Sequence, residues 1–216
     1  MTKNTAFSLL LMFSIPCLGA LPAAAQEDTP FRVNKVNDRV TVFSPGGHAP
    51  PTATTVITTE KGLIVIDTGL SPTLAEWTRR RIFRELGRDD VVTVINTHAH
   101  FDHTDGNQIY AGAEIIAHES VPAAMRLFAA GKQQFIAGRS EGIGRQEQRL
   151  KTLAPGSQDA IALEETIRFN KLLVENVRNR YTPTLPTRTF SDRLTLNVAD
   201  LELPLYSAAL TPTATS

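Results

Sequence analysis

The chain has 216 residues, and its 22 Lys and Arg balance 22 Asp and Glu, so the formal net charge at neutral pH is zero. Balanced charge without long runs of one sign argues against a nucleic-acid-binding surface or a strongly acidic partner. The length suits one domain with a short appendage. Cys17 is the only cysteine, which excludes a disulfide within the chain and a cysteine-rich zinc site.

Residues 1–25 have the pattern of a secretory signal peptide. Lys3 gives a positive start, residues 7–21 are mostly apolar, and Ala23-Ala24-Ala25 offers small side chains for cleavage before Gln26. An uncleaved anchor is the less favoured alternative, because the apolar stretch is short for a bilayer span. We expect a periplasmic or secreted mature chain, residues 26–216, without membrane attachment.

The mature chain begins with expected strands. Alternating apolar residues over Val33–Phe43, interrupted by a turn at Asn37-Asp38, predict two strands, and Ser44–Gly47 has loop composition. Two β-branched or apolar runs, Thr54–Thr59 and Leu63–Ile66, predict a hairpin.

A helix is expected after the turn Asp67-Thr68-Gly69. Ser71 can cap its start, Pro72 suits the first helical position, and Gly87 can end it. Trp77 is expected to pack in the core. The predicted apolar face of this helix consists of Ala75, Ile82, Phe83 and Leu86.

Two further strands and a helical region follow. Val91–Ile95 is typical of a strand buried on both faces, and Ala113–Ala117 predicts a shorter strand before a helix from about Val121 to Ala130. The polar stretch 132–180 predicts an insertion of two or three helices with a break at Pro155-Gly156. A helical connector is favoured over a lid above a site.

Strands are expected again near the end of the chain. Thr195–Val198 and Leu201–Tyr206 flank a turn at Ala199-Asp200. The residues after Tyr206 are small and polar, and codons for this tail, shifted by one base, can encode Phe-Gly-Gly-Ala-His-Thr-Asp-Gly-Asp-Ile. We therefore expect a frameshift close to Tyr206, with an ordinary polar tail as the alternative.

The strongest chemical signal is the run His98-Ala99-His100-Phe101-Asp102-His103, directly after the strand Val91–Ile95. Imidazole nitrogens and carboxylate oxygens are ligands that zinc prefers, and a loop leaving a strand holds ligands rigidly. Three of the five histidines of the chain fall in this run, which disfavours a solvated loop without function. Its spacing allows two neighbouring metal positions, which together can activate water and polarise a carbonyl.

The run resembles the His-X-His-X-Asp-His signature of the metallo-β-lactamase superfamily. It follows a strand-turn-helix-strand unit with an Asp-Thr-Gly turn, as it does in that family, and the similarity covers about residues 32–128 with a weaker part at 186–206. The resemblance implies an α/β fold of the αββα sandwich type. Residues 26–216 would be an incomplete domain, the N-terminal half with a helical insertion at 132–180, and the C-terminal half would be missing.

The resemblance also implies roles for individual residues. His98 and His100 would bind the first metal, and Asp102 and His103 the second. Asp102 would be catalytic as well, because it would orient or deprotonate the bridging water. Asp67 would hold the ligand loop in place without binding metal. The expected cofactor is zinc, with two ions in the complete enzyme and with iron or manganese as alternatives.

The function implied is an exported metal-dependent hydrolase of a small-molecule ester, thioester, lactone or β-lactam. In the family, further ligands follow in the second half, whereas no histidine follows His118 here. The alternative is therefore an inactive remnant or weak metal-binding protein, and we expect the 216-residue form to bind zinc weakly. His48 is expected in an exposed turn rather than over the site, and His118 at a helix start rather than on metal.

The signal peptide gives a direct prediction for the exported protein. Cleavage after Ala25 should give a mature chain that begins at Gln26 or within a residue or two of it. Intact-mass spectrometry of exported material measures this, and a chain still beginning at Met1 in the membrane fraction would establish an anchor instead.

Overall fold

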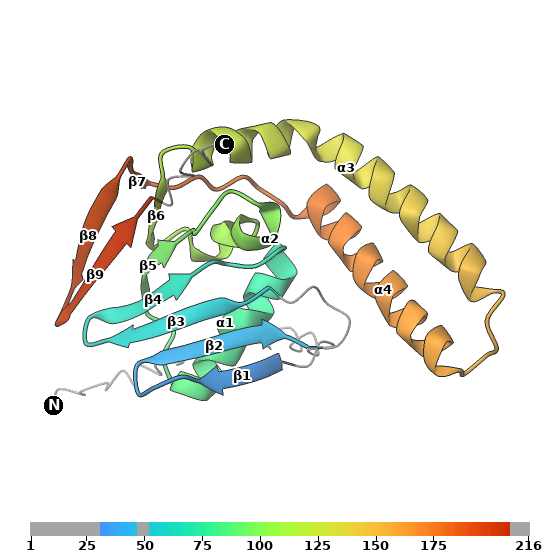
Figure 1. Ribbon diagram of the computed structural model, residues 1–216, viewed down its shortest axis with the longest axis horizontal. Helices are drawn as coiled ribbons and strands as arrows, with labels where there is room; N and C mark the ends of the chain where they lie inside the picture. The colour runs from blue at the N-terminus through green and yellow to red at the C-terminus, as the bar shows by residue number, and fades with distance from the viewer. Residues whose placement is uncertain (1–30, 47–51, 208–216) are drawn as a thin grey trace, which may run out of the picture.

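The structure is a computed structural model that describes residues 31–46 and 52–207. The expected signal peptide, His48 and the polar tail beyond Ser207, on which three of the predictions rest, lie outside these ranges. The main element is a seven-stranded sheet whose strands follow one another in chain order (Figure 1). These strands are β1 (Phe31–Lys35), β2 (Val40–Pro45), β3 (Thr54–Thr59), β4 (Gly62–Ile66), β5 (Val91–Ile95), β6 (Glu114–His118) and β7 (Arg188–Phe190).

The first four strands pair antiparallel, and β4 to β7 pair parallel. Parallel neighbours need crossover connections, and helices supply them. The remaining elements are the helices α1 (Pro72–Leu86), α2 (Phe101–Thr104), α3 (Val121–Leu150) and α4 (Gln158–Asn179), a 3₁₀ helix (Asn107–Tyr110), and a separate hairpin of β8 (Arg193–Val198) and β9 (Leu201–Tyr206).

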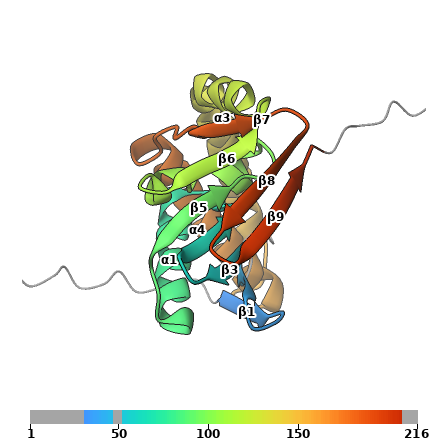
Figure 2. The ribbon, with the colours of Figure 1, turned by 90° about the vertical axis from the view of Figure 1, so that its left-hand side faces the viewer.

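Both faces of the large sheet are covered, which explains its continuous apolar strands. In β4, Leu63 and Val65 pack with Ile82 of α1, whereas Ile64 belongs to a cluster with Leu196 of the β8–β9 hairpin. Figure 2 shows α1 and this hairpin on opposite sides of the sheet. The expected layered α/β fold is thus confirmed, with a helix, a seven-stranded sheet and a second, two-stranded sheet in succession.

The predicted ends of α1 are confirmed. The Ser71 hydroxyl accepts a hydrogen bond from the backbone of Leu74 at 3.3 Å, and Gly87 ends the helix in the left-handed region with φ of 67°. Trp77 is buried, as expected. The predicted apolar face was wrong at Phe83, which is 54% exposed. Successive helical residues are about 100° apart, so Phe83 turns away from the sheet when Ile82 faces it.

Two predicted boundaries differ from the structure. The helix expected to end at Ala130 continues through Gly131 as a single helix, α3, of 30 residues. The glycine is tolerated because α3 is held by its packing on both sides of this position, described below. Strand β2 extends into the expected loop as far as Pro45, because β1 pairs with it there. The predicted break at Pro155-Gly156 between the long helices is confirmed.

Figure 1 shows α3 and α4 as a long antiparallel hairpin whose tip projects away from the sheet. Its apolar seam joins a cluster with Leu74 and Trp77 of α1, so its base is packed onto the domain. Within residues 31–46 and 52–207, no helix has both the length and the apolar character needed to cross a membrane.

A close backbone crossing fixes the loop that carries the histidine run. A Cβ added to Gly106 would lie 2.1 Å from the backbone oxygen of Thr68 and 2.6 Å from the Cβ of Ala75. Only glycine fits at this crossing, which brings the loop onto the Asp67-Thr68-Gly69 turn.

Gly106→Ala should therefore lower the free energy of unfolding by about 2–3 kcal/mol, because the backbone must move apart. Gly112→Ala is the matched control, because nothing lies within 4 Å of its added Cβ. Urea denaturation of both variants measures the difference. Equal stability of the two would contradict the close crossing.

Candidate metal centre

The histidine run leaves the carboxyl end of β5, beside the turn that follows β4. The backbone N–H of Asp67 donates to the carbonyl of Ile95 at 2.9 Å, and that of Thr68 donates to the carbonyl of His103 at 2.9 Å. The ends of two parallel strands thus bring Asp67 and the run together, as the sequence predicted for these residues. This edge of a parallel sheet is a common location for functional groups.

Alternate residues of the run are anchored to α3. Ala99 packs against Val121 and Met125, and the ring of Phe101 stacks on Phe128 with centroids 5.4 Å apart. Ala99 lies in the bend after Thr97, Phe101 begins α2, and both side chains are partly buried, so these contacts hold the run without involving the imidazoles. The two residues that the signature leaves unspecified therefore serve as the anchors.

The three histidines form one cluster. The ring centroid of His98 lies 4.6 Å from that of His100 and 4.1 Å from that of His103. The Asp102 carboxylate reaches the same cluster, with Oδ2 3.4 Å from Nε2 of His103. The structure therefore brings together all four residues that the sequence predicted as metal ligands.

The carboxylate of Asp67 is buried against this loop and holds it through hydrogen bonds. It accepts hydrogen bonds from the Thr97 backbone at 2.8 Å, from the Thr97 hydroxyl at 2.7 Å and from Nδ1 of His103 at 2.7 Å. Asp67 is a buried residue with φ of 57°, in the left-handed region that costs a non-glycine residue free energy. The three hydrogen bonds offset that cost and leave Nε2 of His103 directed away from Asp67.

The environment keeps His98 uncharged. Partial burial lowers the pKa of His98 below its ordinary value, and the neighbouring rings of His103 and His100 lower it further. A neutral imidazole is the form that binds a metal cation. The electrostatics of the cluster thus favour a metal over a proton at His98.

A second buried carboxyl group lies just beyond the run. Asp105 is 2% exposed, and burial raises its pKa to about 8, so the group holds a proton at neutral pH. The Tyr181 hydroxyl interacts with it, although neither group completes a hydrogen bond of good geometry. No sequence pattern indicated Tyr181, which lies far along the chain on the segment after α4.

The segment after α4 is tied to the ligand loop at several points. Gln108 donates to the carbonyl of Arg180 at 3.0 Å and accepts from the backbone of Thr182 at 2.7 Å. The Asn107 amide donates to the carbonyl of Thr184 at 3.1 Å. No role was predicted for Asn107 from the sequence, although this residue lies close after His103 and directly follows Gly106.

The donor chemistry of the cluster fits a borderline cation such as zinc. Three imidazoles and one carboxylate are gathered, and His103 is oriented by a carboxylate in the manner common for metal-binding histidines. Within the described ranges, however, no three His, Cys, Asp or Glu side chains converge closely enough to hold an ion. The described residues therefore supply the donors and their orientation without forming a closed site.

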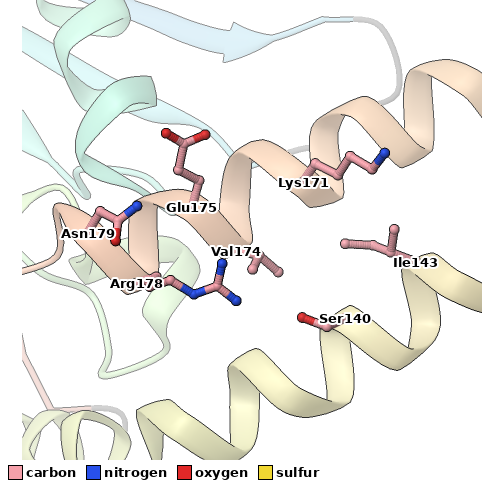
Figure 3. Close-up of a pocket in the computed structure, with 7 residues that line it drawn as sticks. All are labelled: Ser140, Ile143, Lys171, Val174, Glu175, Arg178 and Asn179. Atoms are coloured by element: carbon pink, nitrogen blue, oxygen red, sulfur yellow. The ribbon is translucent and has the colours of Figure 1, made fainter.

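Other candidate positions have structural roles. His118 is within hydrogen-bond distance of the Ser120 hydroxyl at 2.8 Å and of the carbonyl of Ser191 at 2.8 Å, so both ring nitrogens are occupied. A groove of about 390 Å³ lies between α3 and α4, lined by Ser140, Ile143, Lys171, Val174, Glu175, Arg178 and Asn179 (Figure 3). None of the histidines lines this groove, so it is separate from the candidate metal centre.

A family model for the metallo-β-lactamase superfamily matches residues 49–203, which include the histidine run and the Asp67 turn. The chain belongs to this superfamily. Its members generally bind divalent metals, and the donor cluster occupies the matched region. Among curated proteins, none matches this sequence significantly.

Solved structures similar to the chain include metallo-β-lactamases. That from Pontibacter korlensis is 17% identical with a TM-score of 0.49, and the match covers 82% of this chain and 60% of that chain. A HARLDQ-motif mutant from Cronobacter sakazakii is 29% identical with a TM-score of 0.39, over 44% and 38% of the two chains. One from Hirschia baltica is 20% identical with a TM-score of 0.38, over 44% and 46%.

The stacking of Phe101 on α3 predicts that Phe128 supports the ligand loop. Phe128→Ala should cost about 2 kcal/mol of stability and speed amide exchange in residues 97–107, because the loop loses its anchor. Phe169→Ala is the control, since Phe169 lies on α4 in the apolar cluster that the hairpin forms with α1, whereas Phe128 stacks directly on Phe101. Hydrogen–deuterium exchange measured by mass spectrometry separates them, and similar exchange in both variants would rule out this role.

Proposed function

We propose that this protein is an exported metal-dependent hydrolase. The observation that carries the proposal is the clustering of His98, His100, Asp102 and His103 on one loop, with Asp67 orienting His103. Superfamily membership supports metal-dependent hydrolysis in general. The signal-peptide pattern of residues 1–25 supports export to the periplasm or the medium.

The proposed metal is zinc, with iron or manganese as alternatives. His98 and His100 would hold one ion, and Asp102 and His103 a second. When bound, such ions supply a Lewis acid and lower the pKa of a coordinated water. The chain spans 60% of the Pontibacter korlensis enzyme to which it is similar, so the ligand set of the active protein is itself part of the proposal.

Asp102 is proposed to act directly on the attacking water. Its carboxylate is partly exposed, unlike that of Asp67, so it is accessible from solvent. Oδ2 can accept the proton of a water molecule placed between Asp102 and the substrate, which orients the water for attack. Asp67, buried under the loop, keeps its role of holding Thr97 and His103.

The proposed substrates are small molecules with an activated carbonyl: esters, thioesters, lactones or β-lactams. These share a carbonyl carbon that water attacks and an oxygen that gains negative charge during the attack. The neutral net charge of the chain gives no support for a nucleic-acid substrate. The alternative proposal is a weak metal-binding protein without catalytic activity, favoured by the lack of a closed ligand group among the described residues.

Replacing a proposed ligand should weaken zinc binding. We expect His98→Ala and His103→Ala each to raise the zinc dissociation constant at least tenfold, measured by competition with a chromophoric chelator. His118→Ala is the matched control, because this histidine is bonded to Ser120 and Ser191. If zinc binding is unchanged in the first two variants, the proposed centre is wrong.

Activity decides between the two proposals. Zinc-dependent turnover of any member of an ester, thioester, lactone and β-lactam panel, lost on chelation and in Asp102→Asn, would support the hydrolase. Zinc binding that depends on His98 and His103, without turnover of any of these compounds, would support the binding protein.

A further inference from the structure

Thr97 occupies a position between Asp67 and His98 that the metal-ligand assignment does not use. Its hydroxyl oxygen lies 2.7 Å from Oδ2 of Asp67 and 3.0 Å from Nδ1 of His98. Its backbone N–H donates to Oδ1 of the same carboxylate at 2.8 Å. The hydroxyl is therefore held at two points and is not free to rotate toward another partner.

The direction in which the Thr97 hydroxyl donates its proton determines which ring nitrogen of His98 is protonated. A carboxylate has no proton to donate, so a 2.7 Å contact between Thr97 Oγ and Asp67 Oδ2 requires that Thr97 donate. Its oxygen can then only accept from the ring at 3.0 Å. Nδ1 of His98 must carry the proton, which leaves Nε2 of the neutral ring with its lone pair.

The same reasoning applies to His103 without an intermediate. Nδ1 of His103 lies 2.7 Å from Oδ2 of Asp67, so this nitrogen carries a proton and donates it, while Nε2 lies 3.4 Å from Oδ2 of Asp102. One carboxylate oxygen thus places a proton on Nδ1 of both rings, directly for His103 and through a hydroxyl for His98. Those rings lie next to each other, with centroids 4.1 Å apart.

We propose that Thr97 is a positioning residue that relays the Asp67 carboxylate to His98 and fixes this ring with the proton on Nδ1. In this form His98 offers Nε2 to a cation without first changing its proton position or its orientation. The value of this for metal binding rests on the proposed function, whereas the position of the proton can be measured without metal.

Two substitutions test the contribution of the Thr97 hydroxyl group separately from that of the rest of the side chain. Thr97→Val keeps the shape of the side chain and removes the hydrogen bonds, and Thr97→Ser restores the hydroxyl without the methyl group. Thr104→Val is the matched control, because the Thr104 hydroxyl lies in the same loop but donates to the backbone carbonyl of His100, at 3.2 Å. Metal-free protein labelled with ¹⁵N is used, at a pH where the imidazoles are neutral.

Long-range proton–nitrogen spectra report which ring nitrogen of His98 is protonated. We expect Nδ1 in the unchanged protein, in Thr97→Ser and in Thr104→Val, and a shift toward protonation on Nε2 in Thr97→Val. Chelator competition on the same samples should show zinc affinity reduced at least tenfold in Thr97→Val alone, the range usual for groups that orient a metal-binding histidine.

Retention of the Nδ1 proton by His98 in Thr97→Val would overturn the proposal, as would failure of Thr97→Ser to preserve it. Loss of the Nδ1 proton in Thr97→Val together with no measurable zinc binding in any sample would support the role of Thr97 and contradict the proposed metal-dependent function. The two inferences therefore fail on different observations.

Discussion

The burial of one carboxylate under the histidine loop is the constraint on which the candidate site depends. Asp67 accepts hydrogen bonds from the backbone and hydroxyl of Thr97 and from His103, and it does so in a left-handed backbone conformation. A buried carboxylate left without such partners is costly, so the loop and the turn stabilise each other. The close crossing at Gly106 brings the two backbones near enough for these bonds to form. The geometry of the histidine cluster is therefore determined by the buried groups of the Asp67 turn.

The helical hairpin contributes to the same site through packing. Phe101 stacks on Phe128, and Ala99 lies against the start of α3, so the first turns of this helix form one wall of the ligand loop. The segment that follows α4 completes the support, because its backbone is bonded to Gln108 and Asn107. The base of the hairpin thus has the contacts of a structural support. Hydrophobic anchoring thus acts in the middle of the loop, and hydrogen bonds hold the residues on either side of it.

Local patterns in the sequence predicted the elements well and indicated the histidine run as a cluster of donors, because these depend on spacing and on capping side chains. The start and end of α1 and the histidine run are of this kind. The uninterrupted course of α3 through Gly131 could not be predicted, because packing against α4 and the ligand loop outweighs the low helix propensity of glycine. Tyr181 and the Phe101–Phe128 stack were also beyond prediction, since both depend on which distant segments meet in the fold. The proton position of His98 could be inferred only from the distances between Thr97, Asp67 and His98 in the structure.

The base and the tip of the α3–α4 hairpin differ in how freely their sequence and length can change. Near its base, each residue that contacts the loop is constrained by the positions of the histidines. Toward the tip, which Figure 1 shows projecting away from the sheet, α3 and α4 pack mainly on each other. Paired insertions or deletions of whole helical turns in the two arms would keep their apolar seam in register. The distal arms can therefore change in length, or accept a fused module in the connection at Pro155-Gly156, while the base keeps the contacts that hold the histidine loop.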